Sequence, residues 1–439
     1  MSRERHHPNR RGSTLILVIW AVAILAIVVA GTQIICFRMA ALGSKSLERV
    51  QARWAARAGA EQMISVLSFG IENPTPDDAF QTLRTLEDYA EGETATGFWK
   101  ITHVLNGEEY LGPMDESAKL NINTLNTLEM QEIELDGLSD DVIDAIIDWR
   151  DDDDEVSLLG AERDYYQNRN KRYEPRNADF KSIAELELVA GVWSESLRGE
   201  DKRLLNQPPA GNTEGWGQYL TALTYDIGYT RDGYPKYVLA DLETSELIEY
   251  FSLTEDQAEA VLQFAGNNDS GRLEEIFSLG VSGPQSGSTT RSGTGRSTSG
   301  IVDDDEGNEG QLTLDQYRMI LDEGWIGDID ERRPGRLNVN TAPLLALETI
   351  FSFDPSIAEE ITQLRQSKEG GITSLVDLLD IGRITPEVLA AIGHRLTTEA
   401  SLYSITSRGR SINGDIETAI YMVVNRSTLP VQILEYREE

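Results

Sequence analysis

The chain has 439 residues, 40% of them hydrophobic, which is enough for about three folded units with cores of their own. Lys and Arg number 39 against 74 Asp and Glu, so the formal net charge is −35. A surface this acidic repels phosphate backbones and argues against nucleic-acid binding. The single cysteine, Cys36, excludes an internal disulfide and a cysteine-rich zinc site. Because the four histidines are scattered and the sequence lacks hydrolase, zinc-protease, P-loop and dinucleotide motifs, we expect a protein that is not an enzyme.

The amino terminus combines a basic segment with a long apolar one. Residues 1–12 contain four arginines and one glutamate, and the next charged residue after Arg11 is Arg38. The uncharged stretch between them is long enough to cross about 30 Å of hydrocarbon as a helix. The basic flank predicts that residues 1–12 stay in the cytoplasm while the rest of the chain is exported. A plain signal anchor fits as well, whereas a cleaved signal peptide has a shorter apolar run.

The helical pattern continues beyond the apolar stretch. Leu47, Val50, Trp54, Met63 and Leu67 recur at near-helical spacing without an intervening proline. One helix over 13–69 would be about 85 Å long at 1.5 Å per residue. Its second half is expected to pack on a soluble domain, and the Asn-Pro-Thr-Pro sequence at 73–76 is expected to end it.

Internal repeats organise the middle of the chain. Leu120-Asn121-x-Asn123-Thr124 and Leu337-Asn338-x-Asn340-Thr341 match closely, and residues 235–247 form a weaker copy. Each copy is followed by two further echoes, at 138–150, 253–264 and 353–365, and then at 180–191, 271–280 and 372–382. Each final echo closes with a glycine suited to a helix carboxyl cap, and Thr254 with Gln257 and Ser182 with Glu185 are spaced as capping boxes. Short helices of this kind resemble helix-hairpin-helix or SAM-like units.

Strand-like segments flank these repeats. Residues 98–106 and 108–116 surround Gly107, and three more segments lie at 401–410, 417–426 and 431–438. The economical arrangement is one antiparallel sheet that rests on the long helix, with the helical modules inserted between its strands. Residues 282–310 are rich in Gly, Ser and Thr and then in acids, which predicts a flexible linker.

An acidic loop follows the first repeat. Residues 148–164 crowd eight carboxylates together, and Asp151, Asp153 and Glu155 alternate so that they could converge, with Glu162 closing a cage. Hard divalent cations such as calcium take six to eight oxygen ligands of this kind. We therefore predict a calcium site formed by Asp151, Asp153, Glu155, Glu162 and Asp164. The spacing is not that of an EF-hand, and a solvated acidic loop that holds no ion is the alternative.

Several of these segments, taken together, resemble a known family. Arg10-Arg11-Gly12-Ser13 resembles the site that prepilin peptidase cuts in type IV pilins and type II secretion pseudopilins. Leu17 stands where most of that superfamily has glutamate, and the K-type minor pseudopilin is the member that lacks this glutamate. Asp115-Glu116 before the first repeat, together with residues 148–166 and 336–343, extends the resemblance to that K component over most of the chain.

The resemblance implies an α+β fold. Its long N-terminal transmembrane helix would pack on a small antiparallel, pilin-like sheet, with all-α helix-hairpin-helix or SAM-like modules inserted. The expected organisation is a leader (1–12), a long helix (13–69), the first part of the core (70–117), helical module 1 (118–210), helical module 2, read as an insertion (211–281), a linker (282–310), helical module 3 (311–398) and the strands that complete the sheet (399–439).

The resemblance also implies a function. Cleavage after Gly12 would expose Ser13 for N-methylation, with prepilin peptidase as the processing enzyme. The protein would then sit at the tip of the periplasmic pseudopilus with other minor pseudopilins, assisting its initiation and the export of folded proteins. It would be a single-pass inner-membrane protein with its carboxyl-terminal bulk in the periplasm, calcium in the acidic loop and no nucleic-acid partner. Two alternatives from other classes are a membrane-anchored helix-hairpin-helix DNA receptor and a calcium-dependent membrane-anchored adhesin.

Overall fold

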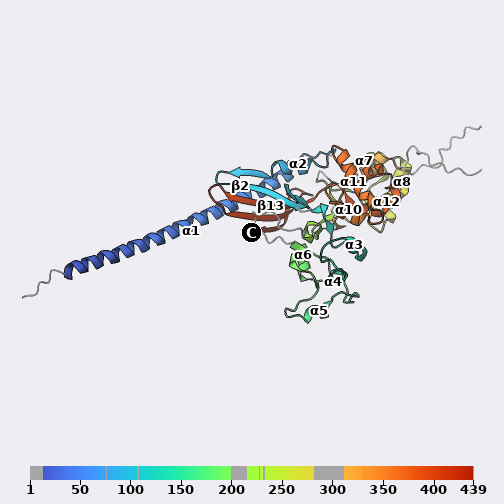
Figure 1. Ribbon diagram of the computed structural model, residues 1–439. Coiled ribbons are helices and arrows are strands. Elements are labelled where there is room, and N and C mark those ends of the chain that lie inside the picture. The colour runs from blue at the N-terminus through green and yellow to red at the C-terminus, as the bar shows by residue number, and fades with distance from the viewer. Residues whose placement is uncertain are drawn as a thin grey trace, which may run out of the picture.

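The computed structural model describes residues 13–75, 77–105, 108–198, 215–226, 228–230, 233–280, 311–329, 331 and 333–438. Within these ranges one long helix leads into an elongated head that contains a sheet and a set of short helices (Figure 1). The expected leader (1–12), including Gly12, and the expected linker (282–310) lie outside the described residues.

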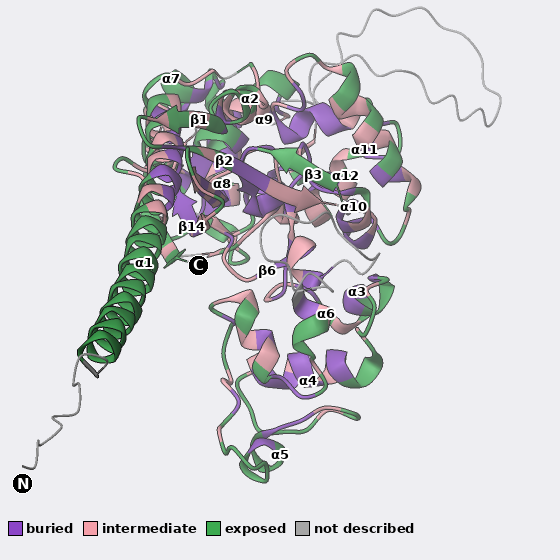
Figure 2. Cartoon of the chain, turned by 60° about the vertical axis from the view of Figure 1, so that its left-hand side comes forward, coloured by how far each residue is buried: buried purple, intermediate pink, exposed green. Residues whose placement is uncertain are grey.

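Helix α1 (Ser13–Glu72) has two environments. An 18-residue window in it has a mean hydropathy of 2.9 and contains no buried residue, so α1 is the one candidate membrane span among the described residues. Its carboxyl-terminal part packs on the sheet (Figure 2). The helix runs three residues beyond the expected end at Phe69, and the chain turns away at Asn73 and Pro74.

Small residues let α1 lie directly against the sheet. Ala52, Ala56 and Ala60 are buried on this face. A Cβ atom built on Gly409 of the facing strand would lie 2.1 Å from the carbonyl oxygen of Ala52, so the two backbones approach as closely as glycine allows. Of the apolar residues expected to pack on the head, Met63 and Leu67 do so.

The other members of that predicted stripe lie elsewhere. Leu47, Val50 and Trp54 are exposed on α1. Near-helical spacing is compatible with more than one face, and alanines allow a closer approach to the sheet than leucine or tryptophan do. The packing expected for these three residues was therefore wrong, and α1 keeps an exposed apolar stripe beside the head.

The sheet joins strands from both ends of the chain. Its path is β1-β2-β13-β14-β15, all antiparallel, and β3 pairs with β2 while β4 pairs with β13. The expected strand at 108–116 is divided into β3 and β4 by Gly112, whose φ is +93°. The strands are β1 (Glu91–Thr94), β2 (Gly97–Leu105), β3 (Glu108–Leu111), β4 (Met114–Asp115), β13 (Leu402–Ser411), β14 (Glu417–Asn425) and β15 (Gln432–Glu438).

Three structural units follow β4, and each is closed by a pair of two-residue parallel strands. The pairs are β5 (Leu120–Asn121) with β6 (Leu220–Thr221), β8 (Tyr237–Val238) with β9 (Gly324–Trp325), and β11 (Leu337–Asn338) with β12 (Leu396–Thr397). Between its two strands each unit has the same series of two α-helices, one 3₁₀ helix and a further α-helix, to which other short helices are added. Their buried apolar side chains form one continuous core.

The helices of the first unit are α3 (Thr127–Glu132), α4 (Asp140–Arg150), η2 (Ile183–Leu188) and α6 (Ser194–Arg198), with α5 (Arg163–Gln167) inserted after α4. Those of the second are α7 (Thr244–Phe251), α8 (Glu255–Asn267), η5 (Leu273–Leu279) and α9 (Leu314–Glu323). Those of the third are α10 (Leu344–Ile350), α11 (Ser356–Ser367), η6 (Leu375–Asp380) and α12 (Pro386–Ile392). The remaining elements are α2 (Gln81–Asp88), η1 (Glu116–Ala118), η3 (Trp216–Gln218), η4 (Leu239–Asp241), η7 (Gly393–Arg395), β7 (Tyr225–Asp226) and β10 (Arg333–Pro334).

This order changes two sequence expectations. Helix α9, expected to open the third module, completes the second unit: Tyr317 stacks on Phe277 at a ring-centroid distance of 4.7 Å, and β9 pairs with β8. Residues 282–310 therefore fall inside the second unit rather than between two modules. The final echoes are 3₁₀ helices, and although Gly191 and Gly280 have positive φ, Gly382 does not.

Asparagine holds the first and third units in the same way. Asn123 exchanges two hydrogen bonds with the backbone of Phe180, at 3.0 and 2.8 Å, and Asn340 does the same with Ile372, at 2.8 Å for both. Both partners lie three residues before the first residue of the 3₁₀ helix of their unit. The repeated asparagine thus replaces a missing backbone partner and fixes the chain where it returns to the core.

A pair of buried acids connects the sheet to these units. Asp115 of β4 accepts hydrogen bonds from Asn338 Nδ2 at 2.9 Å and Thr341 Oγ1 at 2.6 Å. Glu116 accepts from Thr221 Oγ1 at 2.7 Å and forms an ion pair with Lys119 at 2.8 Å. Burial raises the pKa of Asp115 to about 6. Burial acts to raise the pKa of Glu116. The positive charge of Lys119 and the hydrogen bonds from Lys119 and Thr221 outweigh burial, so the pKa of Glu116 is lowered.

Replacing Asp115 by Asn should change the pH dependence of stability. The folded pKa lies above the ordinary value of 3.8, so the unfolded chain loses this proton first as the pH rises. The Asp115 contribution therefore falls by about 3 kcal/mol between about pH 4 and pH 6 and is constant above that window. Urea unfolding at pH 4 and pH 7 should show that Asp115→Asn removes this fall. An unchanged difference between the two pH values would contradict the assignment.

Replacing Gly409 by Ala should loosen the helix on the sheet. The added methyl group meets the backbone of α1, so we expect a loss of about 1–3 kcal/mol in unfolding free energy. Gly266 of α8 is a matched control, because a Cβ there meets no atom within 4 Å. Gly266→Ala should leave stability unchanged or raise it by up to about 1 kcal/mol. Equal losses in both variants would show that helix–sheet contact is not the cause.

Candidate metal centre

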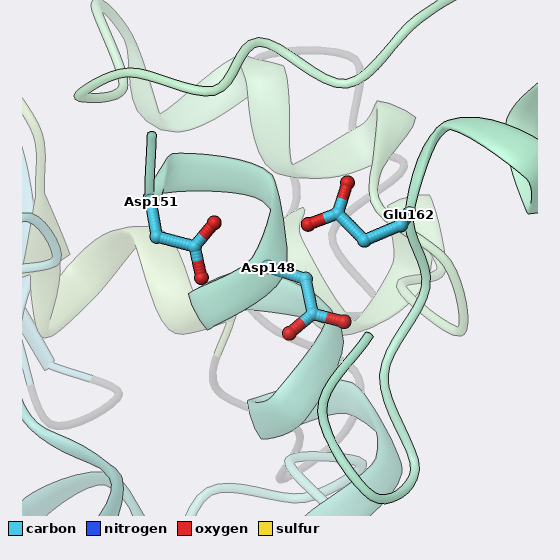
Figure 3. A group of neighbouring side chains, drawn as sticks. All are labelled: Asp148, Asp151 and Glu162. Atoms are coloured by element: carbon cyan, nitrogen blue, oxygen red, sulfur yellow. The ribbon is translucent and has the colours of Figure 1, made fainter. Parts of the chain in front are cut away.

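Three carboxylates converge where α4 gives way to the acidic loop. Asp148 lies in the last turn of α4, Asp151 follows the end of that helix, and Glu162 is the residue before α5 (Figure 3). One oxygen from each lies within 4.8 Å of the others. Among the described residues this is the only group of three or more His, Cys, Asp or Glu side chains with this geometry.

The group is buried and short of hydrogen-bond donors. Asp148 is fully buried and Glu162 is 2% exposed. Both oxygens of Glu162 and Oδ1 of Asp151 have no hydrogen-bond partner. Burial, followed by the charges of Asp148 and Asp151, raises the pKa of Glu162 to about 7. Burial and neighbouring acids, Asp153 first, also raise the pKa of Asp151.

The neighbouring cations are bound elsewhere. Arg150 donates hydrogen bonds to the carbonyl oxygens of Ile122 and Leu125, inside the first unit. Arg163 pairs with Asp154 at 3.4 Å and Glu174 at 3.9 Å. Buried carboxylates without a counter-charge are costly, and a hard divalent cation bound by oxygen would remove that cost. The donor set and its unpartnered oxygens therefore fit a metal ion.

The chain around the group is fixed by short contacts. The backbone N–H of Ser157 donates to both oxygens of Asp148 at 3.2 Å, and that of Leu159 donates to Asp144 at 3.0 Å. A Cβ atom on Gly160 would lie 2.0 Å from Oδ2 of Asp148. Glycine at this position therefore lets the loop close over the carboxylate.

The structure brings together part of the predicted calcium set. Asp151 and Glu162 meet, whereas Asp153, Glu155 and Asp164 are exposed and lie outside the group. Asp153 instead accepts a hydrogen bond from the backbone of Glu155 at 2.7 Å, which forms a tight turn. Ser13, the predicted processing residue, is the first residue of α1, while Gly12 lies outside the described residues.

Sequence reasoning did not include Asp148 among the ligands. It counted Asp148 as one acid among many, although Asp144, Asp148 and Asp151 are spaced four and three residues apart and so share one face of α4. This row of acids, directly before an acidic loop, was the available signal.

A long apolar N-terminal helix packs on an antiparallel sheet, with helical units added, which is the α+β arrangement expected from the sequence. Residues 115–199 match the family model described as type II secretion system (T2SS), protein K. The type II secretion system protein K of Klebsiella pneumoniae is 25% identical over 202 residues, covering 42% of this chain and 59% of the relative. Over these residues the chain is similar to the type II secretion system protein K family.

A solved structure is also similar to the chain. It is the GspK-GspI-GspJ complex from the enterotoxigenic Escherichia coli type 2 secretion system, matched with a TM-score of 0.48 and 13% sequence identity. The match covers 90% of this chain and 99% of the other. The chain spans about three-fifths of the length of the curated Klebsiella relative.

Three variants should separate the observed carboxylate group from the acidic loop in general. Titration of the full chain with CaCl₂ should show that Glu162→Gln and Gly160→Ala each weaken binding about 10- to 100-fold, the first by losing a ligand and the second by displacing Asp148. Asp153→Asn, which removes an exposed charge from the same loop, is the control and should change the affinity less than about threefold. An equal effect of Asp153→Asn would indicate diffuse charge rather than a site.

Proposed function

We propose that the protein is a minor pseudopilin of type II secretion that acts through assembly rather than catalysis. The proposal rests on the two environments of helix α1. Its apolar segment up to Phe37 is uncharged and exposed, as a membrane anchor would be, and its carboxyl-terminal part is fixed to the sheet of the head. Helix and head therefore move as one body, which is what a filament subunit extracted from a membrane requires.

The proposed place in the filament is its tip, with other minor pseudopilins as neighbours. The exposed stripe of Leu47, Val50 and Trp54 offers an apolar surface to adjacent helices. The three helical units lie beyond the sheet, at the far end of the molecule from Ser13, and would block addition of a subunit above (Figure 1). Leu17 supports the same place, since a tip subunit has no terminal amine ahead of it to pair with a glutamate.

The proposed membrane topology follows from charge. The basic residues 1–12 would stay in the cytoplasm, α1 would cross the inner membrane once, and the head would lie in the periplasm. Prepilin peptidase would cut after Gly12, and Ser13 would then be methylated. The assembled protein would assist initiation of the pseudopilus and export of folded proteins.

The proposed ion of the carboxylate group is calcium. Calcium prefers oxygen ligands and tolerates irregular geometry, and Asp148, Asp151 and Glu162 supply only carboxylates. The ion would neutralise charge and connect the end of α4 to the start of α5. Its role would thus be structural, fixing the loop between these helices.

The three units are proposed to serve as helix-hairpin-helix or SAM-like packing modules. Their apolar faces are used within one shared core. In the first and second units, the second helix begins with acids. These are Asp140 and Asp141 in α4, and Glu255 and Asp256 in α8. Acidic helix starts repel phosphate, which disfavours a DNA receptor.

Replacing Gly12 by Val should block processing. A branched residue at the cleavage junction would keep the twelve-residue leader attached, adding a formal charge of +3 to the isolated protein. Intact-mass spectrometry of the membrane-inserted chain should show Ser13 at the amino terminus in the parent and Met1 or Ser2 in the variant. Arg3→Lys, which keeps the leader charge, should be processed normally. A parent protein that retains its leader would refute the proposal.

A further inference from the structure

Basic side chains gather on α1 just beyond its apolar segment. Between Ser13 and Ala60 the helix contains five Lys or Arg and one acid, Glu48, which is a formal charge of +4 in a chain of −35. Because residues four apart lie on the same face of a helix, four of these bases form one basic row. The members of the row are Lys45, Arg49, Arg53 and Arg57. All four are exposed, and the remaining acids of α1, Glu61 and Glu72, follow the row.

The two ends of the basic row differ in their partners. At the end nearer the head, Arg53 pairs with Glu438 of β15 at 2.8 Å, and Arg57 pairs with Glu61 at 3.5 Å. The two bases at the other end form no ion pair with any residue that the structure describes. Unpaired positive charge is therefore found at the end of the row that lies nearer the apolar segment.

The one acid within the row does not neutralise this end. Ser44 Oγ donates a hydrogen bond to Glu48 Oε1 at 3.1 Å. A Cβ atom built on Gly414 would lie 2.6 Å from Oε2 of Glu48, so this carboxylate lies against the turn between β13 and β14. Glu48 is therefore directed to the head, whereas Lys45 and Arg49 are exposed to solvent.

The unpaired bases lie where α1 would leave a bilayer. The uncharged segment ends at Phe37, and Arg38 follows it. At 1.5 Å per residue, Lys45 is about 11 Å and Arg49 about 17 Å beyond Arg38. Side chains on a helix tilt toward its amino terminus, so both reach back toward the apolar segment. The headgroup region is about 5–8 Å thick on each side of the bilayer, so Arg49 also stays within about a Debye length of it.

The head leaves this part of α1 uncovered. Residues 38–47 are all exposed, and the first buried residue of the helix is Ala52 (Figure 2). Met39 and Leu42 are each 68% exposed, so apolar surface continues as far as Lys45. An exposed helical segment that combines apolar and basic side chains next to a membrane span suits the interface between hydrocarbon and head groups.

We propose that Arg38, Lys45 and Arg49 bind the head groups of anionic phospholipids on the face of the membrane from which the head emerges. Charge complementarity selects anionic over zwitterionic lipids. The contact would fix the depth of α1 in the bilayer and would offset the repulsion between an anionic membrane and the acidic head. The inference rests on the proposed membrane anchor.

An acidic protein neighbour is the less favoured occupant of these bases. The unpaired bases begin directly at the end of the apolar segment, where lipid would surround an inserted helix on every side. The bases beside the head, where a neighbouring subunit would pack, are instead neutralised by carboxylates of this chain. Ala52, where the sheet contact begins, lies about 21 Å beyond Arg38, so the unpaired bases are closer to lipid than to the sheet.

The test uses the full chain in phosphatidylcholine vesicles, with a fluorescence donor attached to Cys36. This is the only cysteine of the chain, it is exposed, and it lies two residues before Arg38. Energy transfer is measured to traces of phosphatidylglycerol or phosphatidylcholine that carry an acceptor on one acyl chain. We expect phosphatidylglycerol to be enriched about threefold or more around the donor, and salt to lower this enrichment.

Two double variants locate the contact. Lys45→Gln/Arg49→Gln should lower the enrichment at least about twofold. Arg53→Gln/Arg57→Gln is the matched control, because it removes the same charge from the same row at paired positions, and it should keep the enrichment of the parent. Residues 1–12 are unchanged in both variants, so their arginines do not contribute to the difference.

Each contrary result has a distinct meaning. Equal transfer to both acceptors in the parent would overturn the inference alone and leave the bases to an acidic protein neighbour. An equal loss in the two double variants would also overturn it, because the enrichment would then report overall charge. Transfer to neither acceptor would show that α1 is not inserted, which removes the proposed membrane anchor and this inference with it.

Discussion

The structure depends on the buried acid pair that follows β3. Asp115 belongs to the sheet and accepts hydrogen bonds from the third unit, through Asn338 and Thr341. Glu116, the next residue, accepts from Thr221 in the closing strand of the first unit. Two adjacent carboxylates thus connect three parts of the chain that are far apart in sequence. Because each has named donors, their burial specifies an arrangement that apolar contact alone would leave free to slide.

The closing strands explain how the units tolerate insertions. Each unit is closed by its own pair of parallel strands, so the chain between two helices can lengthen without disturbing the rest. The first unit has its insertion between α4 and η2, where the carboxylate group and α5 lie. The second has residues 281–310 between η5 and α9. The third has short connections throughout.

Sequence reasoning recovered what periodicity and composition determine. The three carboxyl-terminal strands, the long helix and the capping box of Thr254 with Gln257 are confirmed. The capping box expected for Ser182 with Glu185 is absent, because Ser182 accepts from Ala184 and Glu185 pairs with Arg176 at 3.2 Å. Spacing predicts which residues can form a capping box, but here Arg176 competes for the carboxylate of Glu185.

The predictions made from the sequence were wrong where the deciding contact joins residues that are distant in sequence. The face of α1 that packs is set by Gly409, more than 300 residues away, and no local pattern encodes that approach. The end of the second unit is set by pairing of Tyr237 with Gly324, across a Ser/Gly tract that looked like a boundary.

The prediction of the carboxylate group was limited both by competing local hydrogen bonds and by a contact with a later part of the chain. Local alternation favoured Asp153 and Glu155, yet residues two apart on a short turn bond to each other's backbone before they can share an ion. Asp148 is buried because the inserted loop closes over it, and the loop can approach this closely only because Gly160 leaves room. The second unit, whose residues align with α4 through α8, has Gln263 where Asp148 stands, and the third has Gln363. The repeat therefore supplies the position, and the first unit alone places a carboxylate there together with an inserted loop that closes over it.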